Sequence, residues 1–117
     1  MDIFDAIKRR DINSINKYLE EGSINKQDKN GMTPLMVAID NEDYEIVKQL
    51  LMHKMNIDMT DKYGQTAIML AAGRGKIDIV KEILKHKPNL LLKSKSGATA
   101  FEFALENGNT DIAKMLK

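Results

Sequence analysis

Apolar residues recur at helical spacing along the chain, and the clearest stripe lies near its middle. Four apolar residues occupy positions i, i+1, i+4 and i+5 of one segment: Ile46, Val47, Leu50 and Leu51. This spacing places them on one face of an α-helix. A polar turn at residues 40–42 precedes this segment, and Ala38 lies in a further expected helix where helices must pack closely. The pattern therefore predicts two short helices joined by a turn.

This helix–turn–helix segment is one copy of a unit that repeats every 33 residues. A glycine, a threonine, an alanine and an isoleucine each return at that step: Gly31, Gly64 and Gly97; Thr33, Thr66 and Thr99; Ala38, Ala71 and Ala104; Ile46, Ile79 and Ile112. Several positions that agree on one period indicate a repeat architecture. A single unit has no partner for its apolar stripe, so we expect stacked neighbours to bury it, as in a solenoid.

Each unit carries the signals of a turn followed by a helix start. In the Asp-Lys-Asn-Gly run at 28–31, Gly31 can supply a positive φ and Asp28 can accept a bond from the backbone ahead of it. Thr33 is a suitable N-cap. Pro34 fits the first helical position, where its missing N–H costs nothing. We therefore expect a helix to begin directly after this turn.

The run 28–38, Asp-Lys-Asn-Gly-Met-Thr-Pro-Leu-Met-Val-Ala, resembles the turn and TPLHxA signature of the ankyrin repeat. The run 45–51 resembles the second helix of that repeat, and the resemblance covers essentially the whole chain. It implies one domain over 1–117, an all-α solenoid of stacked helix–turn–helix units with protruding turn or hairpin fingers. The implied parts are an N-terminal capping unit, two full repeats and a C-terminal capping unit: residues 1–27, 28–60, 61–93 and 94–117.

Some positions depart from the family pattern. The histidine of the first helix is replaced by Met36, Met69 and Glu102, and we expect the two methionines to fill the core rather than grip a partner. Charged residues replace expected glycines at four helix ends: Arg10, Glu42, Lys54 and Lys87. Each one that adopts a positive φ costs about 1 kcal/mol. We therefore expect a lower stability than that of an idealised array.

The two end units carry polar residues at positions that are apolar elsewhere. Ser14 stands where other units have isoleucine, and Lys117 stands where they have leucine. Polar outer faces are what terminal repeats need. We therefore expect a self-contained, monomeric protein or domain. The pairs Asp2 with Asp5 and Thr99 with Glu102 are expected to cap helices.

Composition narrows the function further. The 117 residues include 18 Lys and Arg against 17 Asp and Glu, a net charge of +1, whereas nucleic-acid binders usually carry a strong basic excess. Cysteine is absent, which rules out disulfides, thiolate metal sites and a cysteine nucleophile. No secretory signal and no apolar run of about 18 residues is present. We expect a cytoplasmic protein without a membrane segment.

Motifs for catalysis, cofactors or metals are incomplete. The run 73–76 hints at a phosphate loop, but that loop needs a glycine and a Ser or Thr where this chain has Leu70 and Ile77. His53 and His86 lie one period apart, yet no third metal ligand accompanies them. We therefore expect neither an enzyme nor a cofactor or metal, and the resemblance likewise implies a non-catalytic module that binds another protein.

The candidate binding residues lie on the expected fingers and on the ends of the first helices. Lys29, Lys62 and Lys95 share one register, so they form either a cationic strip for an acidic segment or ordinary solvated loop lysines. Tyr63 is either an anchor for the partner, because aromatic residues carry much interface energy, or a residue that packs within its turn. The full expected set is Lys29, Asn30, Met32, Asp40, Asn41, Lys62, Tyr63, Gln65, Arg74, Lys95 and Ser96. The alternative function is weak binding of nucleic acid or another acidic polymer through the lysine row.

Overall fold

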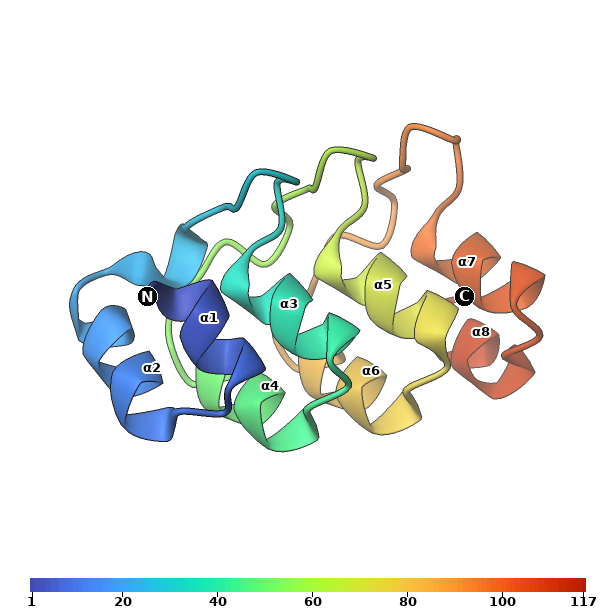
Figure 1. Ribbon diagram of the computed structural model, residues 1–117. Helices are drawn as coiled ribbons and strands as arrows, with labels where there is room; N and C mark the ends of the chain where they lie inside the picture. Colours follow the sequence, from blue (N-terminus) through green and yellow to red (C-terminus); the bar gives the residue numbers. More distant parts are fainter.

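The computed structural model describes residues 1–117 as four stacked helix pairs without any β-strand (Figure 1). The helices are α1 (Ile3–Lys8), α2 (Ile12–Glu20), α3 (Pro34–Asp40), α4 (Tyr44–Leu51), α5 (Ala67–Arg74), α6 (Ile77–Leu84), α7 (Ala100–Glu106) and α8 (Thr110–Leu116), with a 3₁₀ turn at Ser23–Asn25. The inner row consists of α1, α3, α5 and α7, and the outer row of α2, α4, α6 and α8. The expected all-α solenoid is confirmed. None of its helices is both long enough and apolar enough to cross a membrane.

Three loops project on one side of the stack and are called fingers here (Figure 1). Finger 1 is residues 28–32, finger 2 is 61–65 and finger 3 is 94–98. Each is closed by a bond from the backbone N–H of its first residue to the carbonyl of its last: Asp28 to Met32, Asp61 to Gln65, and Ser94 to Ala98. The expected protruding turns are therefore present, one ahead of each of α3, α5 and α7.

The helix starts follow the capping signals in the sequence. The Thr33 hydroxyl accepts a bond from the Met36 N–H at 3.2 Å, and Pro34 occupies the first turn of α3. Thr99 and Glu102 bond each other's backbone N–H in a capping box at the start of α7. Such caps satisfy N–H groups that have no partner inside the helix. The Thr99 box confirms one of the two predicted pairs, and Asp2 with Asp5 forms the other at α1.

The core runs unbroken through all four helix pairs. Leu50 of α4 and Ile83 of α6 hold equivalent places and are fully buried. Met36 and Met69 are each only 1% exposed, which confirms that they fill the core. Neighbouring pairs bury one another's apolar faces, as the solenoid interpretation requires.

Three charged residues adopt the left-handed conformation that favours glycine. Arg10, Glu42 and Lys87 have φ values of 53°, 56° and 52°. Lys54 is not among the residues of positive φ, so one of the four expected substitutions carries no such strain. Arg10 and Glu42 also pair with charges on the next unit, whereas Lys87 makes no ion pair. Lys87 is therefore the position at which the backbone strain of a positive φ can be measured without the loss of an ion pair.

Replacing Lys87 with glycine is expected to raise the free energy of unfolding by about 1 kcal/mol, because glycine adopts this φ without a Cβ clash. Urea unfolding monitored by circular dichroism measures the change. Lys54→Gly is the matched control at the equivalent position and is expected to be neutral or slightly destabilising. An equal stabilisation by both substitutions would contradict the assignment of backbone strain to Lys87.

Candidate partner-binding surface

The three fingers are joined to one another by backbone hydrogen bonds. The Lys62 N–H donates to the Asn30 carbonyl at 3.0 Å, and the Lys95 N–H donates to the Tyr63 carbonyl at 3.0 Å. Glycine permits this close approach, since a Cβ on Gly31 would lie 2.9 Å from the backbone nitrogen of Lys62. The fingers therefore form one continuous row rather than three independent loops.

In each of the first two fingers, an aspartate side chain accepts hydrogen bonds from the backbone of the same finger. The Asp28 carboxylate accepts bonds from the N–H groups of Asn30 at 2.8 Å and Met32 at 2.9 Å. Asp61 does the same for Tyr63 and Gln65, both at 2.9 Å. These carboxylates are directed at the backbone of their own finger. They are thus structural acceptors in the turns.

The finger lysines are exposed and make no ion pair. Lys29 and Lys95 have no side-chain partner, while the Lys62 ammonium lies 3.0 Å from the Asn30 amide oxygen and 5.1 Å from the centre of the Tyr63 ring. Both of these Lys62 partners are uncharged, and its ammonium forms no ion pair. Tyr63 is 58% exposed and presents its ring beside that charge.

The ends of the inner helices are held by ion pairs between neighbouring units. Arg74 at the end of α5 pairs with Asp40 at the end of α3, so two of the expected binding residues contact each other. Lys76 pairs with Glu42 at 3.0 Å. Arg10 pairs with Asp43 at 2.5 Å, and this hydrogen bond holds the pKa of the Asp43 carboxyl below its usual value. Asp43 also caps α4, which fixes the position of this pair.

The remaining expected residues differ in accessibility. Asn41 is exposed and makes no side-chain hydrogen bond, whereas Gln65 is only half-exposed. Met32 packs partly against the core, which leaves less of it for a partner. The Ser96 hydroxyl lies 2.7 Å from that of Ser94, which replaces the aspartate of the other two fingers.

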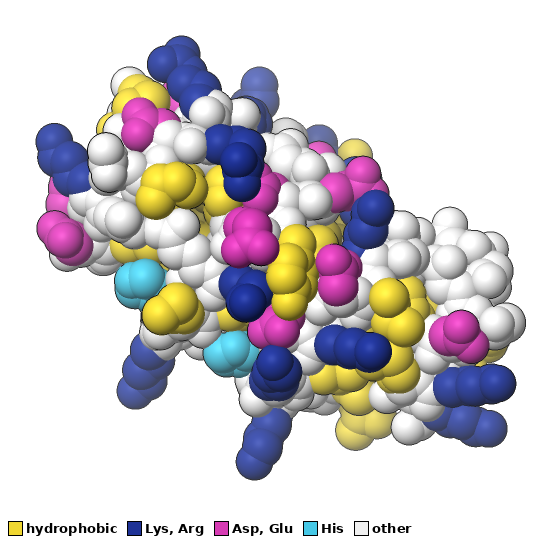
Figure 2. Space-filling model, turned by 90° about the horizontal axis from the view of Figure 1, so that it is seen from below, with side chains coloured by type: hydrophobic (Ala, Val, Ile, Leu, Met, Phe, Trp, Pro, Cys, Tyr) yellow, Lys and Arg dark blue, Asp and Glu magenta, His cyan; other side chains and the backbone are white.

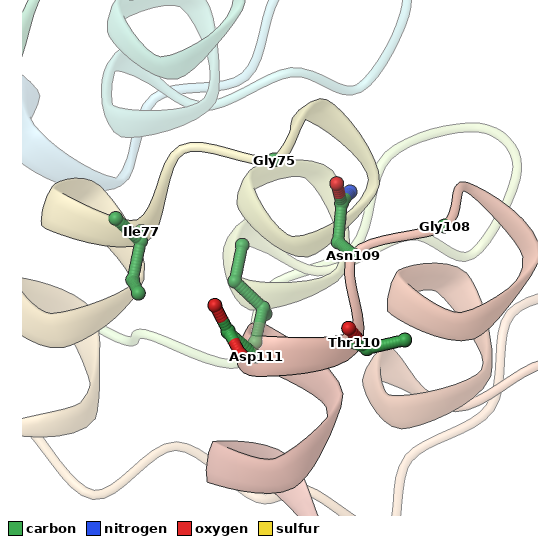
Figure 3. Close-up of a pocket in the computed structure, with 7 residues that line it drawn as sticks. Gly75, Ile77, Gly108, Asn109, Thr110 and Asp111 are labelled. Atoms are coloured by element: carbon green, nitrogen blue, oxygen red, sulfur yellow. The ribbon is translucent and has the colours of Figure 1, made fainter.

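Two shallow hollows were not anticipated from the sequence. One, of about 260 Å³, lies between the starts of α6 and α8 and is lined by Gly75, Ile77, Gly108, Asn109, Thr110, Asp111 and Ile112. Figure 3 shows Ile77 on one side of it and Thr110 and Asp111 on the other. Asn109 ties its two sides together through a 3.0 Å bond to the Ala72 carbonyl. The hollow is open and mostly polar.

The second hollow, of about 340 Å³, lies between α1 and finger 1. Its lining residues are Asp2, Phe4, Asp5, Lys8, Lys26, Gln27, Asp28 and Lys29. It adjoins the expected binding row at Lys29.

The opposite side of the molecule, seen from below in Figure 2, mixes charges of both signs with hydrophobic side chains. There the Glu82 carboxylate accepts bonds from Lys85 and from the Tyr44 hydroxyl, each at 3.1 Å. The Lys85 bond lowers the pKa of Glu82, and partial burial together with the Glu82 bond raises that of Tyr44. Glu82 thus links α4 to α6. No three His, Asp or Glu side chains gather closely enough to hold a metal ion.

A comparison with models of known protein families finds a match to a repeat family. A family model described as ankyrin repeats (3 copies) matches residues 3–94 and 40–117. Together the two matches extend from residue 3 to the last residue. No curated protein matches the chain.

Proposed function

Because the chain belongs to the ankyrin-repeat family, we propose that it is a non-catalytic module that binds an acidic surface of another protein. Ankyrin repeats are generally protein–protein interaction modules. The proposed role is that of an adaptor, an inhibitor or a targeting protein. The partner docks on the fingers and on the neighbouring ends of the inner helices.

The exposed finger lysines, which form no ion pair, are the observation that carries this proposal. Lys29, Lys62 and Lys95 recur at one register and form no ion pair. Asp28 and Asp61, which adjoin Lys29 and Lys62 in the chain, accept bonds from backbone N–H groups and keep their negative charge, which weakens the positive field of the row. A row of like charges attracts an oppositely charged partner and accelerates its association.

The two central units offer the most rigid part of this surface. Finger 2 is bonded to a finger on each side, and Arg74 is held in place by Asp40. Pre-ordered side chains lose less entropy on binding. The proposed binding set comprises Lys29, Asn30, Met32, Asp40, Asn41, Lys62, Tyr63, Gln65, Arg74, Lys95 and Ser96.

Tyr63→Ala is expected to weaken binding of the partner by about 1–2 kcal/mol, as for an exposed aromatic anchor.

The double change Lys29→Glu with Lys62→Glu is expected chiefly to slow association, and more so at low salt. The partner is first recovered by affinity capture and mass spectrometry, and rates are then measured by surface plasmon resonance. Lys48→Ala and Lys81→Ala on the outer helices are the controls. Loss of binding in these controls, with Tyr63→Ala unaffected, would overturn the proposal.

Binding of an acidic polymer through the same lysines is the competing function. A nucleic acid would release counterions, so its affinity would fall steeply and linearly with the logarithm of salt concentration. The net charge of +1 favours a protein. A filter-binding titration at several salt concentrations separates the two.

We further propose that the protein acts in the cytoplasm as a monomer. Ser14 is half-buried against Asp11, with the two side chains 2.7 Å apart, and Lys117 is exposed at the other end. Polar surfaces at the two ends of the stack do not favour end-to-end stacking of one molecule on another. Sedimentation equilibrium at micromolar concentration is expected to give the mass of one chain, 13.2 kDa, and a stable dimer would contradict this proposal.

A further inference from the structure

Finger 3 lacks the internal acceptor that fingers 1 and 2 share. In fingers 1 and 2, the aspartate at the first position accepts bonds from the N–H groups of the third and fifth residues, and both bonds go to the same Oδ1 atom. Serine stands at this position in finger 3, as Ser94. The N–H groups of its third and fifth residues, Ser96 and Ala98, donate to no protein atom.

The backbone of finger 3 nevertheless has the same form as that of the other two (Figure 1). In every finger, the N–H of the first residue bonds the carbonyl of the fifth, and the N–H of the fourth bonds the carbonyl of the first, at 2.9 or 3.0 Å. The N–H groups of Ser96 and Ala98 are therefore directed at one point, as are those that share a single oxygen in fingers 1 and 2. Successive N–H groups in a turn form a concavity that binds an anion.

The side chain of Ser94 stops short of this point. Its Oγ is bonded directly to Cβ, whereas the oxygens of an aspartate lie one bond further out. The Ser94 Oγ instead lies 2.7 Å from the Ser96 Oγ, and this bond uses only one of the two hydroxyl protons. Ser96 is exposed, and the equivalent acceptors Asp28 and Asp61 are only half-buried. A side chain from outside can therefore reach the two N–H groups and the remaining hydroxyl proton.

The charges at finger 3 favour a carboxylate. Fingers 1 and 2 each hold one aspartate and one lysine, whereas finger 3 holds Lys95 and no acid. Lys93 directly precedes it, and both lysines are exposed and form no ion pair. Hydrogen bonds from Thr99, and then the charge of Lys93, lower the pKa of Glu102, which therefore stays negative. Two cations against this one anion leave a positive charge at finger 3, while aspartate offsets lysine within fingers 1 and 2.

We propose that a side-chain carboxylate of the partner takes the acceptor position in finger 3 that Asp28 and Asp61 fill in the other two fingers. One of its oxygens accepts the N–H groups of Ser96 and Ala98, and the other accepts the free hydroxyl proton. The Lys95 ammonium adds an opposite charge. Hydrogen bonds to an ionised acceptor are about twice as strong as neutral ones. The inference rests on the proposed function and adds to it one defined contact, an Asp or Glu of the partner at finger 3.

A titration of the unaltered protein tests the contact directly. The probe is an acetylated, amidated octapeptide of alternating Glu and Thr, added to ¹⁵N-labelled protein and followed by NMR. The amide protons of Ser96 and Ala98 are expected to move downfield, because a bound carboxylate deshields them. The amides of Asn30 and Met32, which already bond Asp28, are internal references and are expected to stay in place. A matched peptide with Gln in place of Glu is the control, and inorganic phosphate is titrated separately.

Two substitutions at Ser94 separate the acceptor position from the charge. Ser94→Asn supplies a neutral internal acceptor to the same two N–H groups, and asparagine suits this turn position. It is expected to weaken binding of the acidic peptide about fivefold, as for lost hydrogen bonds. Ser94→Ala supplies no acceptor, so its affinity is expected to stay within about twofold of the unaltered protein. Attraction by the lysines alone would give the two variants equal affinities.

Equal affinities for the Asn and Ala variants, or unmoved Ser96 and Ala98 amide protons with peptide bound, overturn the inference. No binding of the acidic peptide up to several millimolar overturns it as well, and tighter binding of phosphate rejects a carboxylate as the occupant. The titration decides the matter if a variant fails to fold. Shifts confined to Tyr63 and Arg74 would reject the contact at finger 3 and leave the proposed finger surface standing, so the two failures are distinguishable.

Discussion

Leu50→Ala is expected to lower the free energy of unfolding by about 3 kcal/mol, within the usual range for a buried leucine. Leu50 is fully buried in α4, and the core around it is shared with the neighbouring helix pairs. Removing its side chain leaves a cavity that neighbours on both sides cannot readily fill. A small domain is stable by only about 5–15 kcal/mol, so this is a large share of the total.

Chemical unfolding in urea, followed by circular dichroism, measures this effect. Lys48→Ala is the control because Lys48 lies in the same helix and is exposed. The control is expected to stay within about 0.5 kcal/mol of the parent protein. A loss below about 1 kcal/mol for Leu50→Ala would show that the helix pairs do not share one core.

Gly31→Ala is expected to destabilise the fold by about 2–3 kcal/mol, because it adds a clash to the strain of a positive φ. Gly31 has a φ of 78°, and its new Cβ would lie 2.9 Å from the backbone nitrogen of Lys62. Backbone cannot move aside as a flexible side chain can. The Lys62 bond to finger 1 should weaken together with the fold.

Gly97→Ala provides a matched comparison. Gly97 has a φ of 88° but no atom within 4 Å of an added Cβ. Its substitution is expected to cost only the conformational strain, about 1 kcal/mol. Urea unfolding gives both values, and hydrogen exchange at the Lys62 amide reports the bond between the fingers. Equal costs at the two glycines would refute the close approach of fingers 1 and 2.

The fold could be predicted because each unit repeats the same local sequence signals. Turn glycine, capping threonine and apolar stripe return at one step, so chance agreement at a single position matters little. Thr33, Thr66 and Thr99 all accept a bond from the third residue of their helix, as the pattern predicts. The unit boundaries at 28, 61 and 94 stay predictions.

The surface was harder to predict because it depends on contacts between units. Asp40 and Arg74 are 34 residues apart, one more than the period, and only the stacked geometry brings them together. Lys54 and Lys87 are the same residue type at equivalent positions, yet only Lys87 takes a positive φ. We have no physical account of that difference.

The stacking of the helix pairs also has a mechanical consequence. In the inner row, α1 packs on α3, α3 on α5, and α5 on α7, so each pair is braced mainly by its immediate neighbours. In such an array, a bend can be taken up at the junctions between neighbouring pairs. Fingers 1 and 3 are separated by two junctions, so a partner that spans the row can distribute a bend over both. The two spacings between neighbouring finger lysines would then change together. The elastic cost of fitting a partner of different curvature is spread along the molecule.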